Sequence, residues 1–294
     1  AVSGCAVSGR AAPFQRESAP PMVALDFLDE LVAALESSTA AASIDLGRRK
    51  LGDHGAERLA AGLGVNRSVT SLELECNGIG DHGAGSIAAA LEGNATVTGI
   101  GLAGNKIGDR GAERLAAALA GNASVTCLSL GWNRIGDLGA SRLAAALENN
   151  ASITSLALRN NCITDQGVER LALALESNMS ITDLVLGCNR IGDPGAVRLA
   201  AALAKNSGVT GVGLRGNQIA DRGAESLAAA MEENTTVTSL DLCHNCICDA
   251  GAGRIATVLG HTASVISVGL LGNVISCQIM ERIEASLTKN RAGL

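Results

Sequence analysis

The chain has 294 residues and a formal net charge of −6, and 47% of its residues are hydrophobic although only 1% are aromatic. The acidic balance excludes broad attraction to phosphate backbones, so we expect no nucleic-acid partner. Nine scattered cysteines favour free thiols inside a cell over a disulfide framework, and every apolar run is too short to span a membrane.

The first 40 residues divide into a polar leader and a helix. Residues 1–21 show neither helical nor strand periodicity, which predicts a disordered leader or linker. Residues 22–40 carry apolar side chains at helical spacing, including Phe27 and Leu35. Leu35 lies 28 residues before Leu63, and this interval recurs along the chain. We therefore interpret the segment as a half-repeat that caps the N-terminal end of the domain.

Residues 41–264 form eight repeats of 28 residues, shown most plainly by residues 125–152, VTCLSLGWNRIGDLGASRLAAALENNAS. A fixed period of this length is typical of a solenoid, in which each repeat packs against its neighbours. An asparagine recurs at the same period, and we expect it to pair buried backbone groups where each strand bends into a loop. This structural asparagine ladder consists of Asn77, Asn105, Asn133, Asn161, Asn189, Asn217, Asn245 and Asn273.

Each repeat divides into a strand and a helix. Leu128 and Leu130 alternate with small side chains, which predicts a short strand. From Asp137 onward, apolar side chains recur at helical spacing and predict a helix of about three turns. We expect Asp137 to cap this helix by accepting hydrogen bonds from its first turn. Asn149 and Asn150 are expected to end it, because asparagine tolerates the left-handed conformation.

The short joins between strands and helices imply the overall architecture. Successive strands must run parallel, and such crossovers are almost always right-handed. Strands stack about 4.8 Å apart, whereas packed helices prefer about 8–10 Å. We therefore predict a curved stack with strands on the concave face and helices on the convex face.

The last repeat, residues 265–294, departs from this pattern. Cys277 and Ile279 stand where the interior repeats have Asp and Gly. We interpret it as a degenerate C-terminal capping repeat and expect the chain to end where the solenoid ends. Residues 22–294 would then form one domain.

With these residues in view, the chain resembles leucine-rich repeat proteins of the ribonuclease-inhibitor-like class. The carriers of the resemblance are LELECNGIGDHGAGSIAAAL (72–91) and LGCNRIGDPGAVRLAAAL (186–203), which are similar to repeats of NOD-like receptors. The resemblance covers residues 22–294 and implies an α/β fold, a right-handed horseshoe solenoid. It also implies protein binding, although one fold hosts many unrelated functions.

The strand residues that alternate with the leucines should form the concave face and contact a protein partner. Small side chains dominate there, so Trp132 stands out, either as a partner anchor or as loop packing. The charged residues are either a recognition surface or an ordinary solvated face. The residues predicted to bind the partner are Trp132, Glu73, Glu75, Arg159, Asp183, Arg215, Asp241 and His244.

Two other patterns invite catalytic or metal-binding interpretations. Glu73 and Glu75 lie two apart on one strand, but no histidine or lysine accompanies them, so we predict no catalytic residues and no enzyme. The run CHNCIC (243–248) suggests zinc, against free thiols. It lacks a second ligand pair at a defined spacing, so we predict free thiols, no metal and no cofactor.

We therefore predict a non-catalytic scaffold or recognition module that binds a protein partner. One alternative hypothesis is the sensor or autoinhibitory region of a larger protein of the NOD-like receptor type. Another is a GTPase activator resembling the Ran activator, which the same family includes. We expect an intracellular location, in the cytoplasm or an organelle, and a monomer or a component of a larger assembly.

Overall fold

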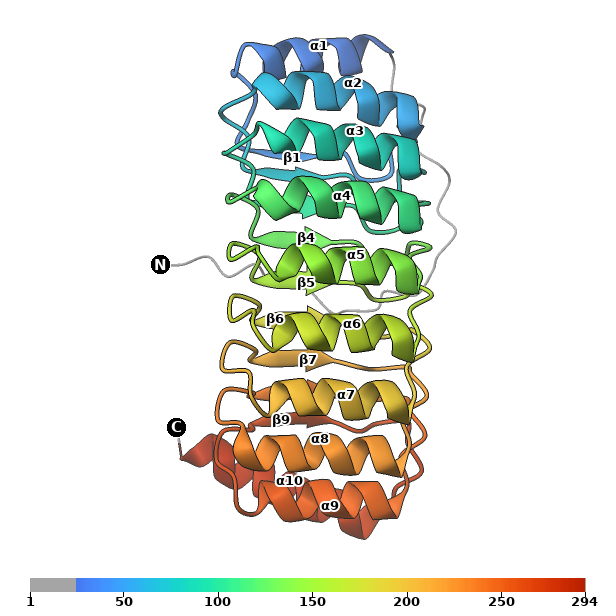
Figure 1. Cartoon of the computed structure of the whole chain (residues 1–294), viewed down its shortest axis with the longest axis vertical. Coiled ribbons are helices and arrows are strands. Elements are labelled where there is room, and N and C mark those ends of the chain that lie inside the picture. The colour runs from blue at the N-terminus through green and yellow to red at the C-terminus, as the bar shows by residue number, and fades with distance from the viewer. Residues whose placement is uncertain (1–24, 294) are drawn as a thin grey trace.

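The computed structural model describes residues 25–293, so the predicted leader at residues 1–21 lies outside the described part of the chain. Within that part, helices and strands alternate along the sequence (Figure 1). The helices are α1 (Leu25–Glu36), α2 (Gly52–Val65), α3 (Asp81–Glu92), α4 (Asp109–Gly121), α5 (Asp137–Leu147), α6 (Asp165–Leu175), α7 (Asp193–Leu203), α8 (Asp221–Glu233), α9 (Asp249–Leu259) and α10 (Cys277–Ala292). The strands are β1 (Ser43–Asp45), β2 (Ser71–Glu73), β3 (Gly99–Gly101), β4 (Cys127–Ser129), β5 (Ser155–Ala157), β6 (Asp183–Val185), β7 (Gly211–Gly213), β8 (Ser239–Asp241) and β9 (Ser267–Gly269).

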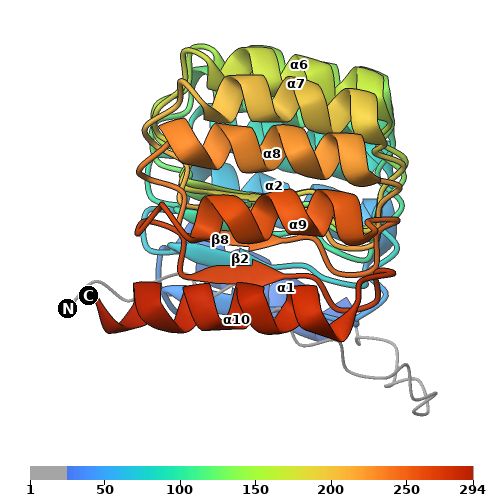
Figure 2. The same ribbon diagram turned by 90° about the horizontal axis from the view of Figure 1, so that it is seen from below.

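All nine strands belong to one parallel sheet, in the order β1 to β9. Each residue pairs with the residue 28 positions later, so that Leu128 lies opposite Leu156 and Leu156 opposite Leu184. In the view of Figure 2 the stack is bowed, with the helices on its outer side. The predicted α/β solenoid is confirmed.

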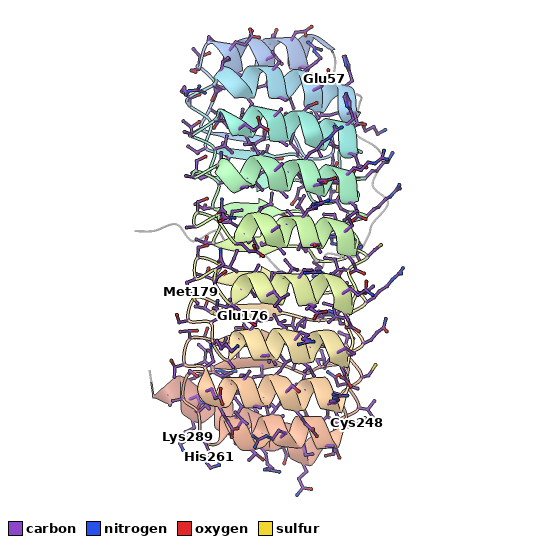
Figure 3. All side chains as sticks on the ribbon, in the orientation of Figure 1. Glu57, Glu176, Met179, Cys248, His261 and Lys289 are labelled. Atoms are coloured by element: carbon purple, nitrogen blue, oxygen red, sulfur yellow. The ribbon has the colours of Figure 1, made fainter. Side chains whose placement is uncertain are left out.

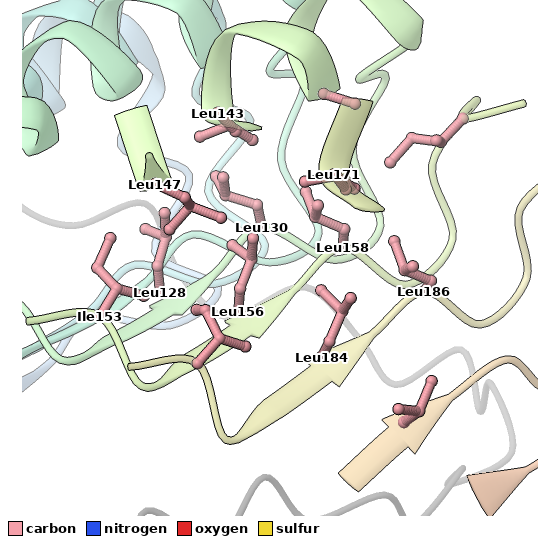
Figure 4. Packing of buried hydrophobic residues seen from close by; sticks show 14 of the residues in the cluster. Leu128, Leu130, Leu143, Leu147, Ile153, Leu156, Leu158, Leu171, Leu184 and Leu186 are labelled. Atoms are coloured by element: carbon pink, nitrogen blue, oxygen red, sulfur yellow. The ribbon is translucent and has the colours of Figure 1, made fainter. Parts of the chain in front are cut away.

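The core is a continuous layer between the sheet and the helices. In the fourth repeat, Leu128 and Leu130 point from the strand toward Leu143 and Leu147 of α5, and each is at most 3% exposed (Figure 4). Burying one leucine of this kind contributes about 1.5–3 kcal/mol. Because every repeat adds the same layer, the sheet is held at the same register along its whole length.

The aspartates at the start of the helices cap a different helix from the one predicted. Asp137 Oδ1 accepts hydrogen bonds from the backbone N–H groups of Thr164 (2.7 Å) and Gly167 (3.0 Å), which lie at the start of α6 in the next repeat. The first turn of α5 is served instead by Asp109 of the repeat before, through Gly136. The prediction that Asp137 caps its own helix is therefore wrong, and the aspartates link neighbouring repeats.

The glycine of the IGDxGA motif follows from this geometry. A Cβ on Gly139 would stand 2.8 Å from both Asp109 Oδ1 and Ile135 Cγ2, closer than any side chain tolerates. The N–H of Gly139 donates to Asp109 Oδ1 at 2.9 Å. Only a residue without a side chain can bring its amide so close to the capping carboxylate.

The prediction for the helix end is also wrong. Helix α5 stops at Leu147, and neither Asn149 nor Asn150 has a left-handed backbone. Asn150 is buried instead, because its Nδ2 donates to Leu119 O (2.8 Å) and Asn122 O (2.9 Å) of the previous repeat. Buried asparagines bridge repeats at every equivalent position from 66 to 234, and we call them the second asparagine row: Asn66, Asn94, Asn122, Asn150, Asn178, Asn206 and Asn234.

The asparagine ladder lies at the opposite end of the strands. Asn161 Nδ2 donates to Leu130 O and Leu158 O, both at 3.0 Å, and its Oδ1 accepts from Ile135 N–H at 3.0 Å. The other ladder members repeat this arrangement at steps of 28, and all are buried except Asn273, which is partly exposed. The sheet is thus fastened at both ends of its strands by side-chain amides.

Candidate functional site

The concave face is built from two positions of each strand and two positions just after it. On β4, Cys127 and Ser129 flank the buried Leu128 and therefore lie on the face opposite the helices. Gly131 and Trp132 follow before the chain turns at the ladder residue Asn133. Figure 3 draws the side chains over the whole stack, seen with the helices in front. By sequence, small residues dominate the concave positions. The few large concave side chains are therefore the candidates for contact with a partner.

A left-handed backbone recurs at the residue before each ladder position. This conformation costs a residue with a side chain about 1–2 kcal/mol, whereas glycine adopts it freely. Three repeats carry glycine there, and the other six do not. The members of this left-handed row, with φ between 54° and 80°, are Arg48, Cys76, Gly104, Trp132, Asn160, Cys188, Gly216, His244 and Gly272.

Trp132 is the bulkiest member of the left-handed row. It is the single tryptophan of the sequence. Its φ is 56°, and the residue is 52% exposed. Its N–H donates to Arg159 O at 2.7 Å, which fixes the backbone against the next strand. A bulky residue with positive φ is an outlier among proteins, and here the ring projects from it into solvent.

Arg159 and Arg215 lie at the centre of the concave face, two repeats apart. Both side chains are half-buried, and Gly187 occupies the equivalent position between them. The Arg159 C=O accepts from Trp132 N–H at 2.7 Å, and the N–H of the next residue, Asn160, donates to Gly187 O at 2.7 Å. The structure thus places Trp132 and Arg159 on adjacent repeats.

The predicted acidic residues divide into two groups. Glu73 and Glu75 lie on one strand and its extension at the N-terminal part of the face, Glu73 half-buried and Glu75 exposed. Burial raises the pKa of Glu73, and the neighbouring charges of Glu75 and Asp45 add to this, while a hydrogen bond from Ser71 opposes it. Asp183 is exposed on β6, far along the sheet from this pair.

Asp241 and His244 lie together on the eighth repeat. Asp241 Oδ1 accepts a hydrogen bond from Cys243 N–H at 3.0 Å, and His244 is exposed in the left-handed row. Burial raises the pKa of the Cys243 thiol, a change that Asp241 reinforces and Arg215 opposes. The face therefore alternates acidic and basic side chains rather than gathering one sign.

The cysteines of the run CHNCIC differ in their exposure. Cys243 is buried in the concave face, whereas Cys246 and Cys248 are exposed on the loop edge. Across residues 25–293, no three His, Cys, Asp or Glu side chains lie together as a set of metal ligands. In the same part of the chain, none of the helices is long and apolar enough to cross a bilayer.

Sequence reasoning missed the left-handed backbone that follows each strand on the concave face. Asn160 and Cys188 belong to the left-handed row and lie between Trp132 and His244 along the stack. The signal was present, because Gly104 and Gly216 occupy the same position in other repeats. Glycine and asparagine at one repeat position indicate positive φ.

Comparison with known proteins places the repeats in a family. A family model described as "Leucine Rich repeat" matches residues 65–88, 93–116, 121–144, 149–172, 177–200, 212–228 and 233–256, more than half of the chain. No curated protein matches the chain in a sequence search.

Among solved structures, two weaker likenesses concern part of the stack. The chain is similar to leiomodin-1, in a structure titled actin-binding site 2, with 23% identity and a TM-score of 0.47 over 51% of this chain and 88% of that one. It is also similar to the tropomodulin C-terminal domain of Caenorhabditis elegans, with 12% identity and a TM-score of 0.46 over 51% of this chain and 93% of that one. Likenesses this distant say nothing about what the chain binds.

Proposed function

The chain belongs to the leucine-rich repeat family, and we propose that it is a protein-interaction module whose concave face binds a protein partner. Solenoids of stacked repeats present extended concave surfaces for such contacts. Trp132 is the proposed anchor of the interface. Glu73, Glu75, Arg159, Asp183, Arg215, Asp241 and His244 are proposed to surround it.

The observation that carries this proposal is the exposure of the Trp132 ring on a concave face of mostly small side chains. The residue has a left-handed backbone that costs about 1–2 kcal/mol and that glycine adopts in three other repeats. Only about half of the ring is buried, so the exposed half contributes nothing to folding. The exposed half of the ring is therefore available to a partner, and tryptophan is a residue type that binding hot spots favour.

The energetics of the exposed ring agree with an anchoring role. A tryptophan buries about 150–250 Å² when enclosed, so covering the exposed half removes on the order of 100 Å² from water. At about 25 cal/mol per Å², this contributes about 2–3 kcal/mol, the size of a binding hot spot. Arg159 on the adjacent repeat is the second residue type that hot spots favour.

Affinity capture from extracts of the source cells tests the proposal. We expect proteins captured by the intact chain to be lost with Trp132→Gly, a substitution that keeps the left-handed backbone favourable. Leu173→Ala is the matched control, because Leu173 is 49% exposed on α6. Equal capture by the intact chain and by Trp132→Gly would remove Trp132 from the interface.

A further inference from the structure

We propose that Arg159 and Arg215 bind the carboxylates of an acidic segment in the partner. This inference rests on the proposed function, since it names the chemistry of the segment that the concave face takes. It is carried by three observations: the two arginines have no ion-pair partner, they lie beside bare glycine backbone, and one of them has a buried donor without an acceptor.

The first observation is the contrast with arginines of the convex face. On the helices, Arg142 Nε lies 3.1 Å from Glu113 and Arg198 Nε lies 3.3 Å from Glu169. Within residues 25–293, no carboxylate lies within ion-pair distance of Arg159 or Arg215. The concave guanidinium groups are half-buried yet uncompensated, which makes them receptive to an external anion.

The nearby aspartates are engaged elsewhere. Asp241 accepts from Cys243 N–H at 3.0 Å, and its Oδ1 lies over Gly269 on the next strand. Asp183 Oδ2 lies 3.4 Å from Thr182 Oγ1, and its Oδ1 lies over Gly211. Both carboxylates therefore lean toward the following repeat rather than toward an arginine.

The second observation is the bare glycine backbone beside Arg159. Arg159 Cγ lies 3.7 Å from the point where a Cβ on Gly187 would stand, so the arm rests on the Gly187 backbone. Gly131 provides equally bare backbone on the other side of Arg159. Arg215 lies one strand beyond Gly187, about 10 Å from Arg159 at the usual strand spacing. Gly187, at the position between the two arginines, has no side chain that separates them.

The third observation is an orphan donor. Among the described residues, Arg159 Nε is the single buried side-chain nitrogen or oxygen that has no hydrogen-bond partner. An unpaired buried donor raises the free energy of the unbound protein. A carboxylate that draws the arm off Gly187 and pairs with Nε and a neighbouring Nη removes this penalty, because guanidinium binds carboxylates through two parallel hydrogen bonds.

The spacing of charges on the concave face favours an acidic peptide over a nucleic acid. A continuous phosphate backbone needs a broad basic surface, whereas this face alternates acidic and basic side chains. Two arginines about two strands apart instead suit a segment that carries a few separated carboxylates. A nucleic-acid ligand is therefore the competing outcome of the test.

The test measures binding of a fluorescein-labelled hexaglutamate peptide by fluorescence anisotropy at low salt. Hexaglutamine and oligothymidine, labelled in the same way, are the comparison probes. The variants are Arg159→Gln and Arg215→Gln, with Arg142→Gln as the matched control because it removes the same charge from the convex face. Urea unfolding of each variant verifies that the fold is retained.

We expect saturable binding of hexaglutamate that each concave variant weakens by about tenfold, the loss of one charge-assisted hydrogen-bonded contact. Arg142→Gln should bind hexaglutamate as the intact chain does. Hexaglutamine should not bind to the intact chain. The inference is overturned by absence of saturable binding, by equal weakening with Arg142→Gln, or by tighter binding of oligothymidine that the same variants abolish. If Trp132→Gly abolishes partner capture while the arginine variants leave hexaglutamate binding unchanged, this inference fails and the proposed function stands.

Discussion

Replacing Asp137 with alanine should loosen the start of the helix in the following repeat, α6, and leave its own helix, α5, intact. Asp137 Oδ1 accepts from Thr164 N–H and Gly167 N–H, and Oδ2 accepts from the Thr164 hydroxyl at 2.7 Å. Loss of a capping side chain costs about 0.5–2 kcal/mol. Because Asp137 accepts three hydrogen bonds, we expect its loss to cost about 2 kcal/mol, the upper end of this range.

Amide hydrogen exchange measured by NMR resolves which helix opens. A loss of about 2 kcal/mol of local stability accelerates exchange by roughly 30-fold. The affected amides should be those of Thr164 and Gly167. The amides of Gly136 and Gly139, which donate to Asp109, should keep their protection.

Asp109→Ala is the matched variant, because it should move the acceleration to Gly136 and Gly139. The reasoning is refuted if Asp137→Ala exposes Gly136 and Gly139 while Thr164 and Gly167 stay protected. That result would mean that each aspartate serves the helix that it begins.

Three further predictions concern stability. Asn161→Ala should lower the urea-unfolding free energy by about 1–3 kcal/mol, because it leaves the buried Ile135 N–H unpaired, while Leu130 O and Leu158 O keep hydrogen bonds from Asn133 and Asn189. An unchanged midpoint would contradict the role of the ladder. Glu73→Gln should stabilise the protein at neutral pH but not at a pH below the ordinary glutamate pKa. Because the pKa of Glu73 is raised in the folded protein, the free energy of unfolding falls as pH rises and the carboxyl ionises. Equal effects at both pH values would refute this. Gly139→Ala should destabilise the fold by at least about 2 kcal/mol through its clash with Asp109 Oδ1, and a variant as stable as the native chain would contradict the close approach.

Most of the fold can be predicted from the period of 28 residues. Because Leu128, Leu156 and Leu184 recur at one repeat position, the sequence predicts the parallel register, the buried layer and the helices on one face. The two local errors arise from the same periodicity. Each of the eight repeats in residues 41–264 contains both the aspartate and the glycine at the same positions. The pattern is therefore identical whether Asp137 caps its own helix or the next one.

The candidate site could be predicted from the sequence in part. Alternation along the strands indicates which residues lie on the concave face, including Trp132 and Arg159. Exposure depends on the neighbouring repeats, however, and Arg159 lies half-buried because Gly131 and Gly187 let its arm lie flat on the backbone. The left-handed row can be predicted only by comparing one position across the repeats. Gly104 indicates a positive φ there, whereas Trp132 by itself does not.

The most direct test of the account is the affinity of a captured partner for the intact chain and for Trp132→Gly, measured by titration calorimetry. Burial of the exposed half of the ring predicts a loss of about 2–3 kcal/mol, or roughly 30- to 150-fold in Kd, with no loss for Leu173→Ala. An unchanged Kd for Trp132→Gly, with the fold intact by circular dichroism, would contradict the claim that the concave face binds through Trp132.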